Sequence, residues 1–300
     1  MNILTGIAVT QLIKQIGINT ATYYNWQERK ECNHLEDKKP VGRNPMRLLY
    51  WEKENIRDFY SEHQGKGYRR ITYMMLDKNI VCVSPSTVYR FLRGEGLLYR
   101  WAQSSSIGKR PAMPTAPNQK WHTDLMVLEI DGENYYYQGI LDAYSRYIIS
   151  WDIHTEGTAL NTSLLLQESY DNSPKGIDPV VIADNGPEFI GKEFREVIKI
   201  HQGKDVRIRP YHPQSNGLEE RFHRTLREEE VEKYKNIIEA KKKIGKYIDY
   251  YNNERLHSSI DYMSPFIWHY GYPNDLKNER REKLKKAQEE RKLENLKKAS

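Results

Sequence analysis

The pattern of apolar and polar positions divides the chain into a helical first part and a mixed later part. Short apolar stripes at helical spacing come first, then a stretch rich in Ser, Pro and small residues, then β-rich runs that alternate with amphipathic ones. The last stretch is almost all Lys, Arg, Glu and Asn, which predicts a solvated helical tail. The expected divisions are a helix-turn-helix region at 1–50, a second one at 51–101, a linker at 102–119, a mixed core at 120–272 and a charged tail at 273–300.

The first helical region predicts two helices joined by a tight turn over residues 10–27. Gly17 suits the turn, and Thr20 can cap the second helix. This pattern favours a DNA-binding helix-turn-helix in which Thr22, Tyr24 and Asn25 face the groove, although an ordinary helical hairpin has the same pattern. The expected inward positions are Leu12, Ile13, Ile16, Ile18, Tyr23 and Trp26.

A second unit of the same kind follows. Residues 68–76 predict one helix, and Ser84 with Pro85 is a strong start for another that ends at Gly94. Two such units in tandem support each other as DNA-binding elements. The residues expected to contact phosphate are Arg69, Arg70, Arg90 and Arg93.

The later part predicts an α/β core with a mixed sheet flanked by helices. Three β-rich runs separated by turn residues suggest a meander, and the alternation after them suggests strands that join the same sheet. The expected strands are 121–130, 134–141, 145–153, 178–183 and 205–209. The expected helices are 157–170, 188–200, one from Pro213 to Tyr234, and 236–252.

Three acidic residues each lie where such a core could present a carboxylate. Asp124 is on the first strand, Asp184 follows the fourth, and Glu220 comes 36 positions later on a polar helix. Carboxylates at strand ends point into the crevice where ligands bind. Three of them together would repel one another unless a cation neutralised them, and Mg²⁺ suits such a site. Asp142, Glu188 and Glu219 compete as candidates, and spacing alone does not rank them.

Charge and composition narrow the classes of protein. The chain has 300 residues with a net charge of +6, and its acidic residues predominate only between 111 and 200. An acidic middle with basic flanks is expected if the flanks bind DNA and the middle holds metal ions. No apolar run is long enough to span a membrane, and the first residues lack a secretion signal. Cys32 and Cys82 form no zinc or disulfide pattern, so we expect a reducing cytoplasm.

Five stretches together carry a resemblance to a known family. They are residues 121–124, 141–146, 183–189, 212–226 and 250–259. In these stretches the chain resembles bacterial insertion-sequence transposases of the DDE type, whose catalytic core is related to that of retroviral integrases. The resemblance covers roughly residues 50–270 and, in its Asn-Gly-x-x-Glu pattern, selects Glu220 over Glu219.

The resemblance implies an RNase H-like core in which Asp124, Asp184 and Glu220 hold two Mg²⁺ or Mn²⁺ ions. It implies cleavage of double-stranded DNA at element ends, followed by attack of the exposed 3′-hydroxyl on a target strand. It also implies a homodimer or higher oligomer, because two ends are joined in one complex. Further DNA contacts are expected at Asn185, His212, Asn216 and Arg221.

The chain also departs from retroviral integrases, since it lacks their zinc-binding His/Cys spacing and has helix-turn-helix units instead. In many bacterial relatives an upstream reading frame supplies part of the DNA-binding region, so a fusion partner is a further expectation. Two other hypotheses stay open. A non-catalytic DNA-binding regulator derived from a transposase would not need three mutually repelling carboxylates, and a simple RNase H-like nuclease would not need tandem DNA-binding units.

Overall fold

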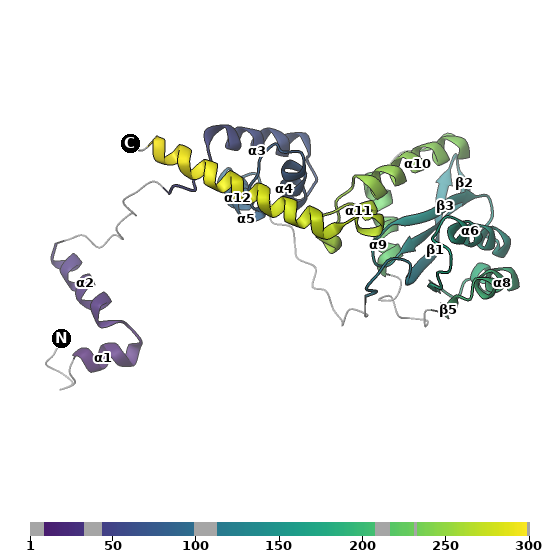
Figure 1. The fold of residues 1–300 in the computed structure, drawn as a ribbon, viewed down its shortest axis with the longest axis horizontal. Coiled ribbons are helices and arrows are strands. Elements are labelled where there is room, and N and C mark those ends of the chain that lie inside the picture. Colours follow the sequence, from purple (N-terminus) through teal and green to yellow (C-terminus); the bar gives the residue numbers. More distant parts are fainter. Residues whose placement is uncertain (1–8, 33–43, 99–112, 208–216, 231–232, 299–300) are drawn as a thin grey trace. The chain divides into compact units, whose positions relative to one another are not determined.

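The computed structural model describes residues 9–32, 44–98, 113–207, 217–230 and 233–298, and they group into two compact units. The first unit combines the described residues up to Arg47 with those from Arg291 onward. The second extends from Leu48 to Glu290 and contains the second helical region and the sheet (Figure 1).

The first unit contains helices α1 (Val9–Ile16) and α2 (Thr20–Glu31). The predicted turn is present, with Gly17 at a φ of +73°, which glycine adopts without the steric cost of a Cβ. The cap is Asn19 rather than Thr20, because the Asn19 side chain accepts a hydrogen bond from the Ala21 backbone amide at 3.0 Å. Thr20 is instead the first residue of the helix.

The inward face predicted for these two helices is largely wrong. Ile13 is the buried residue of α1, and α2 has none among its described residues. Trp26 is 50% exposed, and Leu12 and Ile16 are exposed as well. Two short helices contact each other along one narrow stripe, so most apolar side chains at helical spacing lie outside it.

The second helical region contains α3 (Tyr50–Glu62), α4 (Tyr68–Asp77) and α5 (Pro85–Gly94). The predicted start of α5 is confirmed, since the Ser84 hydroxyl accepts from the Thr87 amide at 3.3 Å and Pro85 occupies the first turn. Buried apolar residues from all three helices and their connections form one cluster. They are Ile56, Phe59, Ile71, Met75, Val81, Val83, Val88 and Leu92.

A five-stranded mixed sheet follows, in the order β3-β2-β1-β4-β5. Its strands are β1 (Lys120–Ile130), β2 (Glu133–Asp142), β3 (Ile148–His154), β4 (Val180–Ala183) and β5 (Lys204–Arg207). The first three form an antiparallel meander, and β4 and β5 add parallel to β1. Asp131 and Gly132 both have positive φ in the β1–β2 turn, as a tight hairpin requires.

Helices cover both faces of this sheet (Figure 1). On one face lie α6 (Ala159–Asp171), α7 (Pro187–Ile190) and α8 (Lys192–Ile200), and on the other lie α9 (Gly217–Glu229) and α10 (Ile237–Asn253). Side chains alternate along β1, so Trp121 packs in the α6–α8 core and Met126 in the α9–α10 core. The mixed α/β core predicted from the sequence is therefore confirmed.

Several element boundaries differ from the prediction, among them the end of α9, which was expected from Pro213 to Tyr234, and the contacts explain two others. β3 begins at Ile148 rather than 145, because the buried Asp142 carboxylate accepts hydrogen bonds from the Ser145 amide and hydroxyl, both at 2.7 Å, and holds a turn there. The helix predicted at 188–200 is broken at Gly191. A Cβ there would lie 2.4 Å from the Ala159 Cβ, so glycine allows α6 to approach.

The chain beyond α10 continues through η2 (Ser258–Ile260), α11 (Pro265–Tyr270) and α12 (Pro273–Lys297). The solvated tail predicted from composition is only partly correct, because Arg280 of α12 is 5% exposed. Its guanidinium donates to the Asp77 carboxylate and to the backbone carbonyls of Asp261 and Tyr262. Throughout the described ranges, no helix has both the length and the apolar composition needed to cross a membrane.

Candidate active site

Strand pairing brings two of the predicted acids together. Trp121 pairs with Val181 and His122 with Ile182 in the parallel β1–β4 ladder. The same offset, continued two residues further, sets Asp124 beside Asp184, just past the end of β4. Paired residues on parallel strands point to the same face, about 4.8 Å apart. Asp124 therefore faces the α9–α10 side, as Met126 does two residues later on the same strand.

The turn after β4 holds Asp184 in place. The Gly186 amide donates to Asp184 Oδ1 at 2.8 Å, which is a local side-chain turn. Arg207 of β5 donates to the Asp184 carbonyl oxygen at 3.1 Å and also to the carbonyl of Phe189. Burial, assisted by the negative charge of Asp184, raises the pKa of Glu188. The turn after β4 is therefore held by hydrogen bonds from Gly186 and Arg207, and it carries two acidic side chains, Asp184 and Glu188.

Helix α9 packs against β1, and its two adjacent glutamates differ in burial. Glu219 points toward the sheet and is 1% exposed, whereas Glu220 is exposed. Consecutive helical residues project about 100° apart, so both cannot face the same way. Glu220 is three residues before His223, whose Nδ1 lies 3.9 Å from Asp124 Oδ2. This spacing puts Glu220 on the helix surface next to the residue that faces Asp124.

Burial sets the protonation of the side chains beneath the acids. It raises the pKa of Glu219 well above its ordinary value, and the charge of Asp124 adds to this effect. It lowers the pKa of His223 to about 4, assisted by the positive charge of Arg227. Both shifts favour the uncharged form of the side chain.

The donor set suits a hard divalent cation. Asp124, Asp184 and Glu220 offer carboxylate oxygens, which Mg²⁺ prefers. Two of these acids are on paired strands, and the third is on the helix that packs against β1. Within the described ranges, no three His, Cys, Asp or Glu side chains converge closely enough to form a metal site. The residue types of the three acids fit Mg²⁺.

The predicted DNA contacts are distributed over several elements. Asn185 and Arg221 are exposed beside the acids, while His212 and Asn216 lie outside the described residues. Thr22, Tyr24 and Asn25 lie on α2, Arg69 and Arg70 on α4, and Arg90 and Arg93 on α5. Most of these side chains are exposed, but Arg70 is half-buried and lies 3.5 Å from Glu229 of α9.

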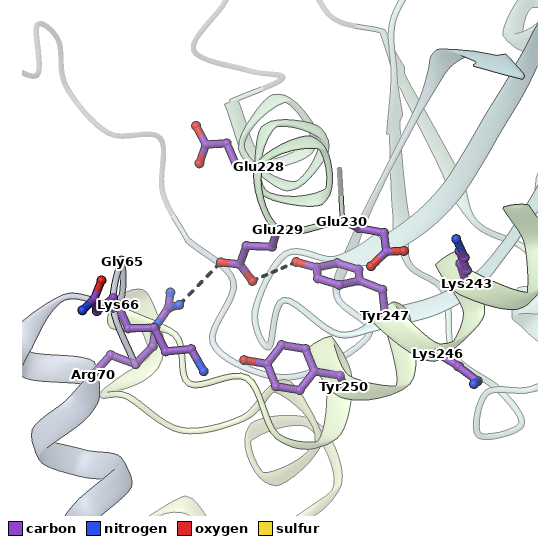
Figure 2. Close-up of a pocket in the computed structure, with 11 residues that line it drawn as sticks. Gly65, Lys66, Arg70, Glu228, Glu229, Glu230, Lys243, Lys246, Tyr247 and Tyr250 are labelled. Atoms are coloured by element: carbon purple, nitrogen blue, oxygen red, sulfur yellow. Dashed lines mark hydrogen bonds and ion pairs between the residues drawn. The ribbon is translucent and has the colours of Figure 1, made fainter. Parts of the chain in front are cut away.

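Arg70 lines a pocket of about 720 Å³ between the α3–α4 turn and helices α9 and α10 (Figure 2). At its centre Glu229 accepts two hydrogen bonds from Arg255, at 2.8 and 2.7 Å, and one from the Tyr247 hydroxyl at 3.2 Å. Lys66 lies over the Tyr250 ring, 5.9 Å from its centroid. None of the three candidate metal ligands lines this pocket, so this pocket and the acids are separate features.

Sequence reasoning missed Glu229 as a contact between the second helical region and the core. It is one of three successive glutamates at the end of α9, and nothing in their spacing distinguishes it. His223 was also missed, but its position three and four residues after the two glutamates could have indicated it. Arg255 and His257 are buried, with ring and guanidinium nitrogens 3.3 Å apart.

Comparison with known proteins agrees with the mixed α/β core. Two adjoining models, both described as an integrase core domain, match residues 114–213 and 202–265. InsK of insertion sequence IS150 from Escherichia coli K12 is 24% identical over 71% of this chain and 81% of InsK. The transposase of IS904 from Lactococcus lactis is 26% identical over 71% of this chain and 90% of that protein. The chain belongs to the integrase-core transposases of bacterial insertion sequences.

The transposase family accounts for the fold as well as the motifs. Its members have the RNase H-like core that the meander, the two added parallel strands and the two helical layers form here. The solved catalytic core of HTLV-2 integrase, in complex with magnesium, is 18% identical with a TM-score of 0.40, over 52% of this chain and 99% of that domain.

Proposed function

We propose that this chain cuts double-stranded DNA at the ends of an insertion sequence and joins the ends to a target, with divalent metal held by Asp124, Asp184 and Glu220. The observation that supports the proposal is the β1–β4 register, which pairs His122 with Ile182 and, at the same offset, would bring the positions of Asp124 and Asp184 side by side. Membership of the transposase family supports the choice of DNA as substrate.

The chemistry follows from the acids and their supports. Bound Mg²⁺ would act as a Lewis acid on the scissile phosphate and lower the pKa of the attacking water. The strands hold the two aspartates, and the Gly186 amide fixes the rotamer of Asp184. Glu220 lies at the solvent side, where a phosphate can approach. No side chain is needed as a covalent nucleophile, because water and then a DNA 3′-hydroxyl attack phosphorus directly.

Recognition of the element ends falls to the helical regions in this proposal. The exposed side chains of α2 and α5 would contact the duplex, with Arg90 and Arg93 on phosphates. Asn185 and Arg221, exposed beside the acids, would hold the strand that is cut. Two ends must be brought together, so we propose that the active form contains at least two copies of this chain.

The test uses the full chain and labelled duplexes taken from the sequences that flank its gene. Cleavage and binding are measured with Mg²⁺ and Mn²⁺ for the wild type, Asp184→Asn and Glu220→Gln. Glu193→Gln, an exposed glutamate on α8, is the matched control. We expect metal-dependent cleavage that both site variants lose by at least about 10²-fold while binding persists. Specific binding without cleavage by the wild type would favour a DNA-binding regulator.

A further inference from the structure

A group of buried polar side chains lies directly beneath the candidate metal ligands. It consists of Tyr137 on β2 and of Glu219 and His223 on α9, all of them less than a tenth exposed. His223 lies between two carboxylates, with Nδ1 3.9 Å from Asp124 Oδ2 and Nε2 3.9 Å from Glu219 Oε2. The three residues and Asp124 therefore form a continuous polar line through an otherwise apolar core.

A glycine in β2, Gly139, leaves room in the sheet for these polar side chains. Asp124 pairs across the β1–β2 ladder with Gly139. A Cβ at Gly139 would lie 2.7 Å from the Tyr137 hydroxyl, so the absence of a side chain lets that hydroxyl reach the level of Asp124. The Tyr137 ring meets the His223 ring edge-on, with centroids 6.1 Å apart. These contacts limit the ways in which His223 can turn.

The polar atoms of this group lack partners elsewhere. Tyr137 Oη, Glu219 Oε1 and His223 Nε2 are buried and make no hydrogen bond to the described residues. Burying an unpaired polar atom is unfavourable, so three in one place are not expected of a simple apolar core. An apolar residue at position 219 or 223 would pack against Phe222, Leu226 and Tyr251 at no such cost.

We propose that His223, supported by Glu219 and Tyr137, is a positioning residue that sets the orientation of the Asp124 carboxylate for metal binding. This inference rests on the proposed function, because it assumes that Asp124 is a ligand. A ring nitrogen beside Oδ2 would restrict the rotation of the carboxylate and leave its other oxygen for the metal ion. Outer partners of this kind orient metal-binding carboxylates generally.

Glu219 is not a ligand in this arrangement. Its side chain is 1% exposed, so it cannot reach a cation that also contacts a DNA phosphate. Its Oε2 faces His223 instead. The buried glutamate thus acts through the histidine, and the exposed neighbour Glu220 keeps the outer position.

The experiment measures Mn²⁺ binding to the full chain by calorimetry, so it does not depend on DNA cleavage. His223→Phe keeps the ring and removes both nitrogens, and we expect Mn²⁺ affinity to fall about 10–100-fold. His223→Asn keeps a donor at the position of Nδ1 and should recover most of that loss. His257→Phe, which replaces a buried histidine that contacts Arg255, controls for the loss of imidazole nitrogens from a buried ring and should leave Mn²⁺ affinity unchanged.

Asp124→Asn separates the two proposals. If it abolishes Mn²⁺ binding while His223→Phe binds Mn²⁺ as tightly as the wild type, the positioning role is refuted and the metal site stands. If Asp124→Asn binds Mn²⁺ normally, the proposed function itself fails. Should His223→Phe fold poorly, Glu219→Gln is measured instead, with an expected loss of affinity in the same direction; unchanged affinity there refutes the role of Glu219.

Discussion

Arg280 of α12 binds Asp77 at the end of α4 through two parallel hydrogen bonds, of 2.8 and 2.6 Å, across 203 positions of sequence. The same guanidinium donates to two backbone carbonyls and lies over the Tyr73 ring, 4.6 Å from its centroid. The planar guanidinium of arginine presents two parallel N–H groups to one carboxylate, and a lysine ammonium group cannot match this bidentate geometry. Arg280 therefore connects the second helical region with the end of the core.

Loss of that guanidinium should destabilise the larger unit. We expect Arg280→Ala to lower the free energy of unfolding by about 2–3 kcal/mol, since hydrogen bonds to charged groups are worth about 1.5–3 kcal/mol each. Arg281→Ala, at the exposed neighbouring position, should change it by less than about 0.5 kcal/mol. Urea unfolding of both variants checks this, and equal effects would mean that the Arg280 contacts contribute little.

Glu229 should matter more than its two acidic neighbours. Burial alone would raise its pKa, but the hydrogen bonds and charge of Arg255, with the charge of Arg70, outweigh burial and lower it. Glu229→Ala leaves the buried Arg255 guanidinium without its carboxylate. We expect a loss of about 2–3 kcal/mol, below the roughly 3–5 kcal/mol of a fully enclosed pair, because Glu229 is partly exposed. Glu228→Ala is the matched control in the same urea titration.

Mild acid should weaken the fold through buried histidines. Burial, then the charge of Arg255, lowers the pKa of His257 well below its ordinary 6.5. At a pH below 6.5 but above the pKa of His257 in the folded chain, His257 is protonated in the unfolded chain and neutral in the folded chain. The free energy of unfolding therefore falls as the pH drops below about 6.5. Replacing His257 with Asn should make the loss between pH 7.5 and 5.5 smaller, measured by urea unfolding at both values. An unchanged pH dependence would argue that His257 is protonated in the folded state.

Gly139 should be intolerant of any side chain while Tyr137 keeps its hydroxyl. A Cβ at this position would overlap Tyr137 Oη, and overpacking of this kind costs about 1–3 kcal/mol. We expect Gly139→Ala to be destabilising and Tyr137→Phe with Gly139→Ala to recover much of the loss. A double-mutant cycle on the free energy of unfolding measures this coupling. Additive effects would place the clash elsewhere.

Much of the core could be predicted from the sequence because its signals are local. β-rich runs bounded by Asp131-Gly132, and the Ser84-Pro85 start of α5, each specify an element without reference to the rest of the fold. The sequence alone also indicated Asp124, Asp184 and Glu220 as separate acids. The pairing of the two aspartates required the strand register, which no local pattern contains.

The wrong predictions concern residues whose burial or helical state depends on contacts with distant parts of the sequence. Trp26 has helical spacing but no surface to pack against in its two-helix unit, so it is exposed. Arg280 lies in a stretch whose composition predicts solvation, yet Asp77 far away in sequence buries it. Gly191 ends a helix because α6 approaches it. Each outcome depends on a tertiary contact that overrides the local preference.

The direct pairing of β1 with β4 has a consequence for how this core can vary. Everything between the two strands, namely β2, β3, α6 and their loops, leaves and returns without entering the space between Asp124 and Asp184. Backbone hydrogen bonds fix the register of β1 against β4, and the length of the intervening chain does not. Loops on the far side of the meander can therefore lengthen, shorten or change sequence while the two strands that lead to Asp124 and Asp184 keep their register.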